Sequence, residues 1–119
     1  SPVESAEQLV KAYQEAVLSQ DYARLASLYN TTADPNGLLF WSTVRISDCE
    51  ITAQKIQTGQ ACFQLQFTVA GPGMSQLKKG TSTAWLWCRR QPQQDGESIS
   101  GWIIEGLMTK QPPTSWWQS

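Results

Sequence analysis

The most informative segment of this chain is Thr81-Ser82-Thr83-Ala84-Trp85-Leu86-Trp87-Cys88-Arg89-Arg90. It is rich in β-branched and aromatic residues, and its side chains alternate. Thr83, Trp85 and Trp87 fall on one parity, and Ala84, Leu86 and Cys88 on the other. Because residues two apart on a strand share a face, the pattern predicts a strand that is buried on at least one side.

Composition indicates one small domain. The chain has 119 residues, of which 40% are hydrophobic and 16% are charged, and its formal net charge is −1. So small a net charge gives no field that would draw in nucleic acid or an acidic membrane. The sequence contains no run of about 18 apolar residues, so it predicts no membrane-spanning helix. We expect a single domain over residues 1–111 and a Pro/Trp tail over residues 112–119.

Histidine is absent, which removes the commonest general base and the commonest metal ligand. Cys49, Cys62 and Cys88 are too scattered for the paired spacing of zinc ligands. We therefore expect no metal and no cofactor.

Two helices and four strands are predicted. Apolar residues at 3–4 spacing predict a helix over residues 3–19, and Asp21 is a suitable cap for a second helix over 22–29. The period then changes toward two, which predicts strands over 44–56, 61–70, 81–90 and 101–110. A parity change predicts a β-bulge near Ser47-Asp48. We expect an α+β fold in which two N-terminal helices pack on a curved, four-stranded antiparallel meander.

The strand patterns also predict a register. Folding the second hairpin about Ser75 places Phe63 opposite Trp87, Leu65 opposite Trp85 and Cys62 opposite Cys88. Folding the third between Asp95 and Gly96 places Trp102 opposite Arg89, Ile104 opposite Trp87 and Gly106 opposite Trp85. One inward face then collects Phe63, Leu65, Phe67, Trp85, Trp87, Trp102, Ile104 and Met108. A slip of one residue would turn the whole set to the wrong side.

This order of elements resembles the cone-shaped, cystatin-like fold of nuclear transport factor 2 and its relatives. The likeness is carried by Glu7-Gln8-Leu9-Val10-Lys11-Ala12-Tyr13, by Ser19-Gln20-Asp21-Tyr22-Ala23-Arg24-Leu25-Ala26-Ser27-Leu28-Tyr29, and by Gly101-Trp102-Ile103-Ile104. Within that superfamily the chain is most similar to small bacterial lipoprotein domains of unknown function, which are exported. In this superfamily the far face of the sheet commonly pairs two copies. With Leu86, Ile103 and Leu107 predicted on that face, a homodimer is plausible.

The superfamily includes enzymes such as ketosteroid isomerase, polyketide cyclases and dehydratases, but their catalytic residues do not carry over to this sequence. Asp48, Glu50 and Glu105 are the acids expected on strands. A carboxylate inside the cone would act as a base with a raised pKa. A strand acid more often points at water on the open face, so we assign no catalytic residue.

Tyr13, Phe63, Trp85, Trp87 and Trp102 are the candidate ligand-binding residues. Aromatic walls with a few polar groups are typical of ligand pockets. The same rings also suit a filled core between sheet and helices, because a chain this small needs several large side chains to fill that space.

The predicted register makes Cys62 and Cys88 direct cross-strand neighbours, which suits either a disulfide or two buried free thiols. Trp116-Trp117 follows two prolines in the tail. Two exposed tryptophans would lower solubility, so we expect this pair to dock in a groove of its own domain or of a neighbour.

We expect a non-catalytic, extracytoplasmic domain that binds a small hydrophobic ligand or a protein partner. Ser1 begins almost directly in helical pattern, which suggests that an export signal has been removed. Membrane attachment would then require a lipid anchor that is no longer present. A cofactor-free enzyme that uses a pocket carboxylate and a Tyr, and a structural dimerisation module, are the alternatives.

Overall fold

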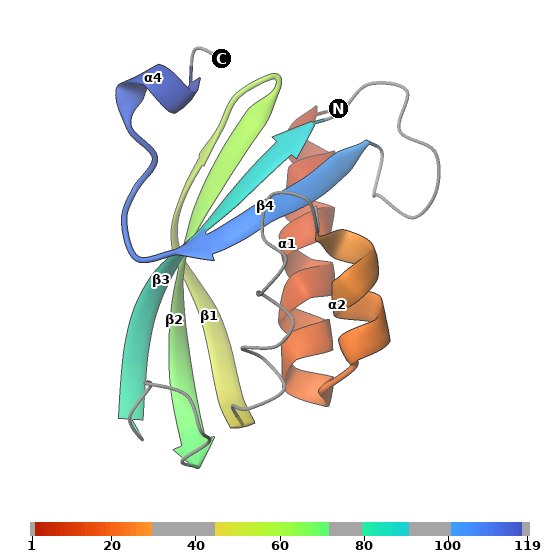
Figure 1. The fold of residues 1–119 in the computed structure, drawn as a ribbon, viewed down its shortest axis with the longest axis vertical. Helices are drawn as coiled ribbons and strands as arrows, with labels where there is room; N and C mark the ends of the chain where they lie inside the picture. The colour runs from red at the N-terminus through yellow and green to blue at the C-terminus, as the bar shows by residue number, and fades with distance from the viewer. Residues whose placement is uncertain (1, 30–44, 72–79, 91–100, 118–119) are drawn as a thin grey trace.

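A computed structural model describes residues 2–29, 45–71, 80–90 and 101–117. In chain order it contains α1 (Pro2–Ser19), α2 (Tyr22–Leu28), β1 (Arg45–Ile56), β2 (Gln60–Gly71), β3 (Gly80–Arg90), β4 (Trp102–Met108) and α4 (Thr114–Trp117). Figure 1 shows α1 and α2 on one side of the twisted sheet and α4 on the other. The predicted α+β class is confirmed.

The break between the two helices has a defined cap. The backbone N–H of Gln20 donates to Val17 O, and that of Asp21 donates to Ala16 O, which together close the end of α1. Gln20 takes a left-handed conformation with φ 58°. The Asp21 carboxylate then accepts from the backbone N–H of Arg24 at 3.1 Å, so the predicted cap of α2 is confirmed.

The strands form one antiparallel sheet in the order β1-β2-β3-β4, which confirms the predicted meander. The register of β1 against β2 shifts between Ile46 and Asp48, where a bulge was predicted. Two further shifts, between Arg45 and Ile46 and between Ile51 and Ala53, were not predicted.

The predicted register of β2 against β3 is wrong by one residue. Phe63 lies opposite Leu86, not Trp87, and Leu65 lies opposite Ala84. Because a shift of one residue exchanges the two faces, Trp85 and Trp87 point away from the helices. A physical reason is visible at Trp87, whose indole Nε1 donates to Lys110 O at 3.0 Å. Facing outward gives this N–H a partner, which an apolar core would have to supply in another way.

The predicted register of β3 against β4 is also wrong. Trp87 lies opposite Gly106, Cys88 opposite Ile104, and Arg90 opposite Trp102. The register shifts between Trp87 and Cys88, which leaves Glu105 as the extra residue on β4. This bulge keeps Ile104 and Trp102 on the inward face with Cys88, and it turns Glu105 outward with Arg89.

The core lies between the two N-terminal helices and the inward face of the sheet. Its fully buried members come from five elements, and the largest are Trp102, Tyr13, Phe63, Phe67, Leu9, Leu25, Leu65, Leu86 and Ile104. Gln14 Nε2 donates to Cys49 O at 2.7 Å and ties α1 to β1. Leu86 and Leu107 belong to this inward side. Of the three residues predicted to form an outer apolar strip, Ile103 alone faces outward, so that strip does not exist.

Candidate functional site

The five predicted ligand-binding residues do not share one face of the sheet. Tyr13, Phe63 and Trp102 are completely buried between helices and sheet. Trp85 and Trp87 are half-buried on the opposite face. The expectation that all five line one pocket is therefore wrong, and its cause is the one-residue error in register.

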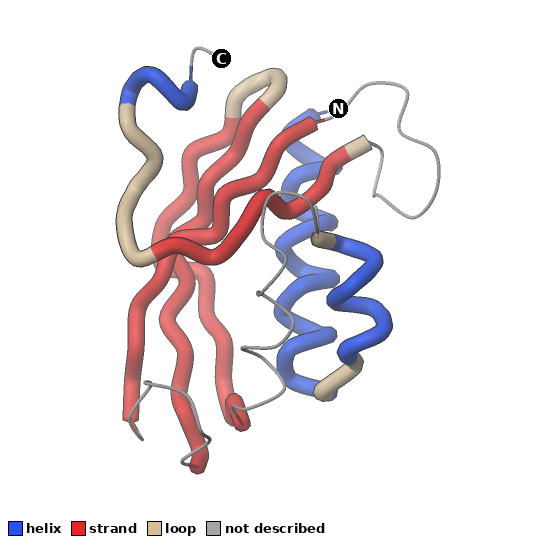
Figure 2. The backbone as a smooth tube through the Cα atoms, viewed as in Figure 1, coloured by secondary structure: helices blue, strands red, loops and turns tan. Residues whose placement is uncertain are grey.

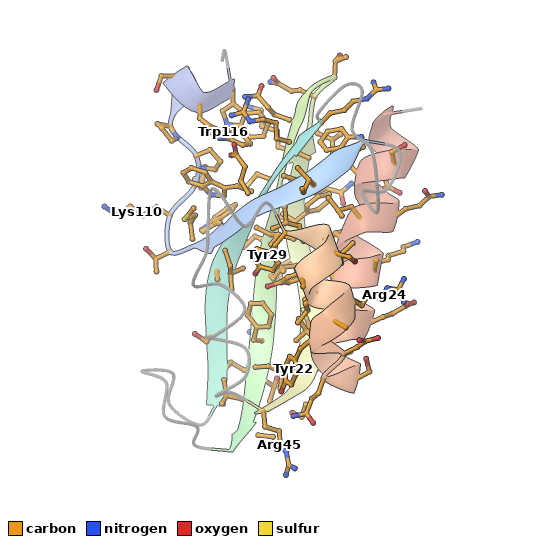
Figure 3. All side chains as sticks on the ribbon, turned by 45° about the vertical axis from the view of Figure 1, so that its right-hand side comes forward. Tyr22, Arg24, Tyr29, Arg45, Lys110 and Trp116 are labelled. Carbon is orange, nitrogen blue, oxygen red and sulfur yellow. The ribbon has the colours of Figure 1, made fainter. Side chains whose placement is uncertain are left out.

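Two tyrosines meet in the core beneath α1. The hydroxyls of Tyr13 and Tyr29 lie 3.3 Å apart and their ring centroids 6.2 Å apart. Tyr29 also forms a parallel β-bridge with Ile104, and Figure 3 shows its position at the end of α2. Trp102 Nε1 is buried and has no hydrogen-bond partner among the described residues. Close packing of these large side chains fits the second interpretation offered for them, a filled core.

The outer face carries a second cluster, which the C-terminal segment builds. Figure 2 shows the chain leaving the end of β4 and running back along the sheet to α4. We call Trp87, Arg89, Glu105, Trp116 and Trp117 the tail cluster. The Trp87 and Trp116 rings lie 5.4 Å apart, and Trp117 meets Trp116 edge-on at 4.8 Å. The tail was expected to dock on its own domain or on a neighbour, and it docks on its own domain. Figure 3 labels Trp116.

Glu105 is the electrostatic centre of the tail cluster. Its Oε1 accepts from Arg89 Nε at 2.8 Å, and its Oε2 accepts from Trp116 Nε1 at 2.8 Å. The guanidinium of Arg89 also lies 5.3 Å from the Trp116 ring centroid. Two strands and the tail are thus joined through one carboxylate, and hydrogen bonds to an ionised acceptor are among the stronger ones.

A third tie comes from the end of β1 and the start of β2, on either side of the turn that joins them. Gln60 is buried, and its side-chain Nε2 donates to Trp116 O. Lys55 Nζ lies 4.6 Å above the ring of Trp117. Cys62 lies on the outer face, so it does not belong to the main core. Its side chain is nevertheless buried, with 3% of its surface exposed.

Two adjoining grooves run between the tail and the end of β1. The larger has a volume of about 320 Å³ and is lined by Lys55, Gln57, Gln111, Pro112, Thr114 and Trp117. The smaller has a volume of about 120 Å³ and is lined by Ala53, Gln54, Lys55, Cys62, Trp85, Gln111, Pro112 and Trp117. One wall belongs to the sheet and the other to the tail, so both grooves depend on the docked position of the tail.

The three candidate acids do not line these grooves. Asp48 and Glu50 are exposed, as strand acids on an open face commonly are. Glu105 is half-buried, with its two oxygens engaged by Arg89 and Trp116. The geometry of Glu105 makes it a structural tie between β4 and the tail.

All three cysteines are free in the structure. Cys62 lies opposite Trp87, and Cys88 lies opposite Ala61, so the two thiols point to opposite faces and the predicted cross-strand pairing of Cys62 with Cys88 is wrong. Of the two alternatives, a disulfide or buried free thiols, the structure has the free thiols. Burial raises the pKa of Cys62 to about 12. Burial, with a smaller contribution from Asp48, raises that of Cys49 to about 12. Burial, then Cys62 and Glu105, raises the pKa of Cys88 well above 9.0. Thiols with such pKa values are poor nucleophiles at neutral pH.

Within the described ranges, no group of three or more His, Cys, Asp or Glu side chains could hold a metal ion. None of the helices described is both long enough and apolar enough to cross a membrane.

Neither protein-family models, curated proteins nor solved structures match this chain. The resemblance to nuclear transport factor 2 thus stays a prediction.

Sequence reasoning missed the groove residues Lys55, Gln57, Gln111 and Thr114. Their only signal in the sequence was indirect, namely the Pro-led tail that ends in Trp116-Trp117. Nothing in the sequence pattern indicated that this tail would pack against the end of β1. A short polar segment has no apolar periodicity from which its packing partner could be predicted.

Proposed function

We propose that this chain is a non-catalytic binding domain whose ligand contacts the outer grooves rather than the helix-covered core. The observation that carries the proposal is the larger groove, with its volume of about 320 Å³ and its aromatic wall at Trp117. Small-molecule sites in proteins begin at about this size and combine apolar or aromatic walls with a few placed polar groups. A small organic molecule with a flat apolar part therefore suits it.

The cone-shaped, cystatin-like arrangement and an extracytoplasmic location remain parts of this proposal. Two helices on one face of a four-stranded meander support the first. A charged share of 16%, with Gln, Ser and Thr in many polar positions, is the argument for the second. A protein partner, the cofactor-free enzyme and the dimerisation module stay alternatives, without a specific contact in their favour.

A fragment screen followed by NMR of backbone amides and indole N–H groups tests the proposal. Fragments that bind should shift the signals of Trp117, Lys55 and Gln57. Trp117→Ala should abolish these shifts. Tyr22→Ala is the matched control, because Tyr22 is an aromatic residue, 37% exposed, on α2. It should leave binding unchanged.

Two outcomes would contradict the proposal. The first is a fragment that shifts the signals of Tyr13, Phe63 and Trp102 instead, which would return the site to the core. The second is a library of diverse fragments, none of which binds at any concentration at which the protein remains folded.

A further inference from the structure

The two grooves beside the tail carry little charge for a small-molecule site. Of the described residues that line the two grooves, Lys55 is the only charged one. Its ammonium group lies 4.6 Å above the Trp117 ring, a cation–π contact. An anionic ligand would therefore meet one cation that already has an aromatic partner, and a cationic ligand would meet no acid.

The remaining polar groups in the grooves are neutral and can act in both directions. Gln54, Gln57 and Gln111 each carry an amide that donates and accepts, and the Thr114 hydroxyl does the same. Ligand hydroxyls likewise both donate and accept, so they can satisfy these groups without an ion. The lining is too polar for a purely hydrophobic ligand, because its amides would lose water without replacement.

The flat surfaces in the grooves complete this pattern. Trp117, Trp85 and the Pro112 ring provide apolar area beside the amides. A sugar ring combines hydroxyl groups around its edge with an apolar C–H face, and so matches neutral amides and indole rings at once. We propose that the grooves form a binding site for a neutral saccharide, which docking of the tail through Trp116 completes. This inference rests on the outer-groove function proposed above and names its ligand class.

Trp116 is a positioning residue in this site. It lines neither groove. It holds the tail through the Glu105 carboxylate, the Trp87 ring and the Gln60 side chain. The neighbouring residues Thr114 and Trp117 then stand opposite Lys55 and Gln57. Because the ligand contacts both walls, saccharide binding and tail docking must favour each other.

Titration of the whole chain with neutral hexasaccharides tests the inference. The probes are maltohexaose, cellohexaose and chitohexaose, with a galacturonate hexamer as the anionic comparison, followed by NMR and calorimetry. At least one neutral probe should shift the signals of Gln57, Gln111 and Trp117, and the anionic probe should bind more weakly. Trp117→Ala should weaken binding at least about tenfold, and Tyr22→Ala should not change it.

Trp116 variants separate positioning from general stability. Trp116→Ala should weaken binding at least about tenfold while the amide signals of α1 and α2 stay in place. Trp116→Phe keeps a ring against Trp87 and should recover much of the affinity. In the native chain a bound saccharide should slow alkylation of Cys62, since the docked tail helps to cover it, and it should leave alkylation of Cys49 unchanged.

The outcomes distinguish this inference from the broader proposal. If no neutral saccharide binds while other fragments occupy the grooves, the ligand class is wrong and the outer-groove function stands. If a saccharide binds the Trp116→Ala chain as tightly as the native one, the tail does not complete the site. If neither saccharides nor fragments reach the grooves, both fail together.

Discussion

The indole of Trp116 donates to the carboxylate of Glu105 across 2.8 Å, and this bond joins the C-terminal segment to β4. The two residues are eleven positions apart, and the other oxygen of Glu105 is held by Arg89. Fixing Glu105 in this way sets where the tail lies on the outer face. The grooves described above follow from that position.

Removing this bond alone should loosen the tail without unfolding the sheet. Trp116→Phe keeps the aromatic packing but loses the N–H donor to a charged acceptor, and we expect the free energy of unfolding to fall by about 1.5–3 kcal/mol. Chemical denaturation measures this change. Trp117→Phe is the matched control, since its contacts with Trp116 and Lys55 are ring contacts. Equal losses in the two variants would count against a specific role for the Trp116 N–H.

Register can be tested on β3 by comparing two side chains three positions apart. Leu86 is completely buried on the inward face, so Leu86→Ala should lower the free energy of unfolding by about 2–5 kcal/mol. Thr83 is exposed on the outer parity, and Thr83→Ala should change it by less than about 0.5 kcal/mol. Urea denaturation of both variants gives the comparison. If Leu86→Ala has only a small effect, the result would support instead the register in which the tryptophans of β3 face the helices.

The end of α1 offers a stabilising substitution. Gln20 has φ 58°, a region that L-residues enter at a cost and that glycine enters freely. Gln20→Gly should therefore raise the free energy of unfolding by about 0.5–1 kcal/mol. Gln8→Gly, at an exposed position inside the same helix, should lower it by about 1 kcal/mol. Thermal denaturation measures both changes. If both variants are less stable than the native chain, the left-handed conformation of Gln20 at the end of α1 would be contradicted.

Buried thiols should make the protein sensitive to alkali. Burial holds the pKa of Cys49 and Cys62 at about 12 in the folded chain, against 9.0 ordinarily. Between these values the unfolded chain has lost thiol protons that the folded chain keeps. The contribution of these thiols to the free energy of unfolding is therefore fully present below about pH 8. It is lost as the pH rises from about 9 toward 12, by up to about 1.4 kcal/mol per pH unit for each thiol.

Denaturation at a series of alkaline pH values measures this slope. A variant with alanine at Cys49, Cys62 and Cys88 removes all three thiols and should lose most of the slope, whatever its stability at neutral pH. Tyr and Lys side chains also titrate in this range, and the comparison subtracts them. An unchanged slope would contradict the assigned burial of the thiols.

Several elements of the fold were predictable because their signals are local. Asp21 can cap a helix only by reaching the next turn, and it does so at Arg24. The parity change at Ser47 predicted a bulge that lies there in β1. The alternation of Phe63, Leu65 and Phe67 correctly indicated a buried face of β2.

The candidate site was not predictable in the same way, because both faces of β3 read as apolar. Trp85 and Trp87 have larger rings than Leu86 and Cys88 on the other parity, so the sequence pattern favoured turning the tryptophans inward. The structure buries Leu86 and Cys88 instead and covers Trp87 with the tail. The bulge at Glu105 also shifts the register of β4 against β3, and the alternation of side chains in β4 did not predict this shift.

Sequence alone determined the two N-terminal helices, the four strands and their antiparallel order, since each depends on the spacing of neighbouring side chains. Tertiary structure decided which face of β3 turns inward, where Trp116 docks and which residues line the outer grooves. The physical reason is that a strand with two apolar faces has two registers of similar local quality. The choice between them is made by partners distant in the chain, here α1 on one side and the tail on the other.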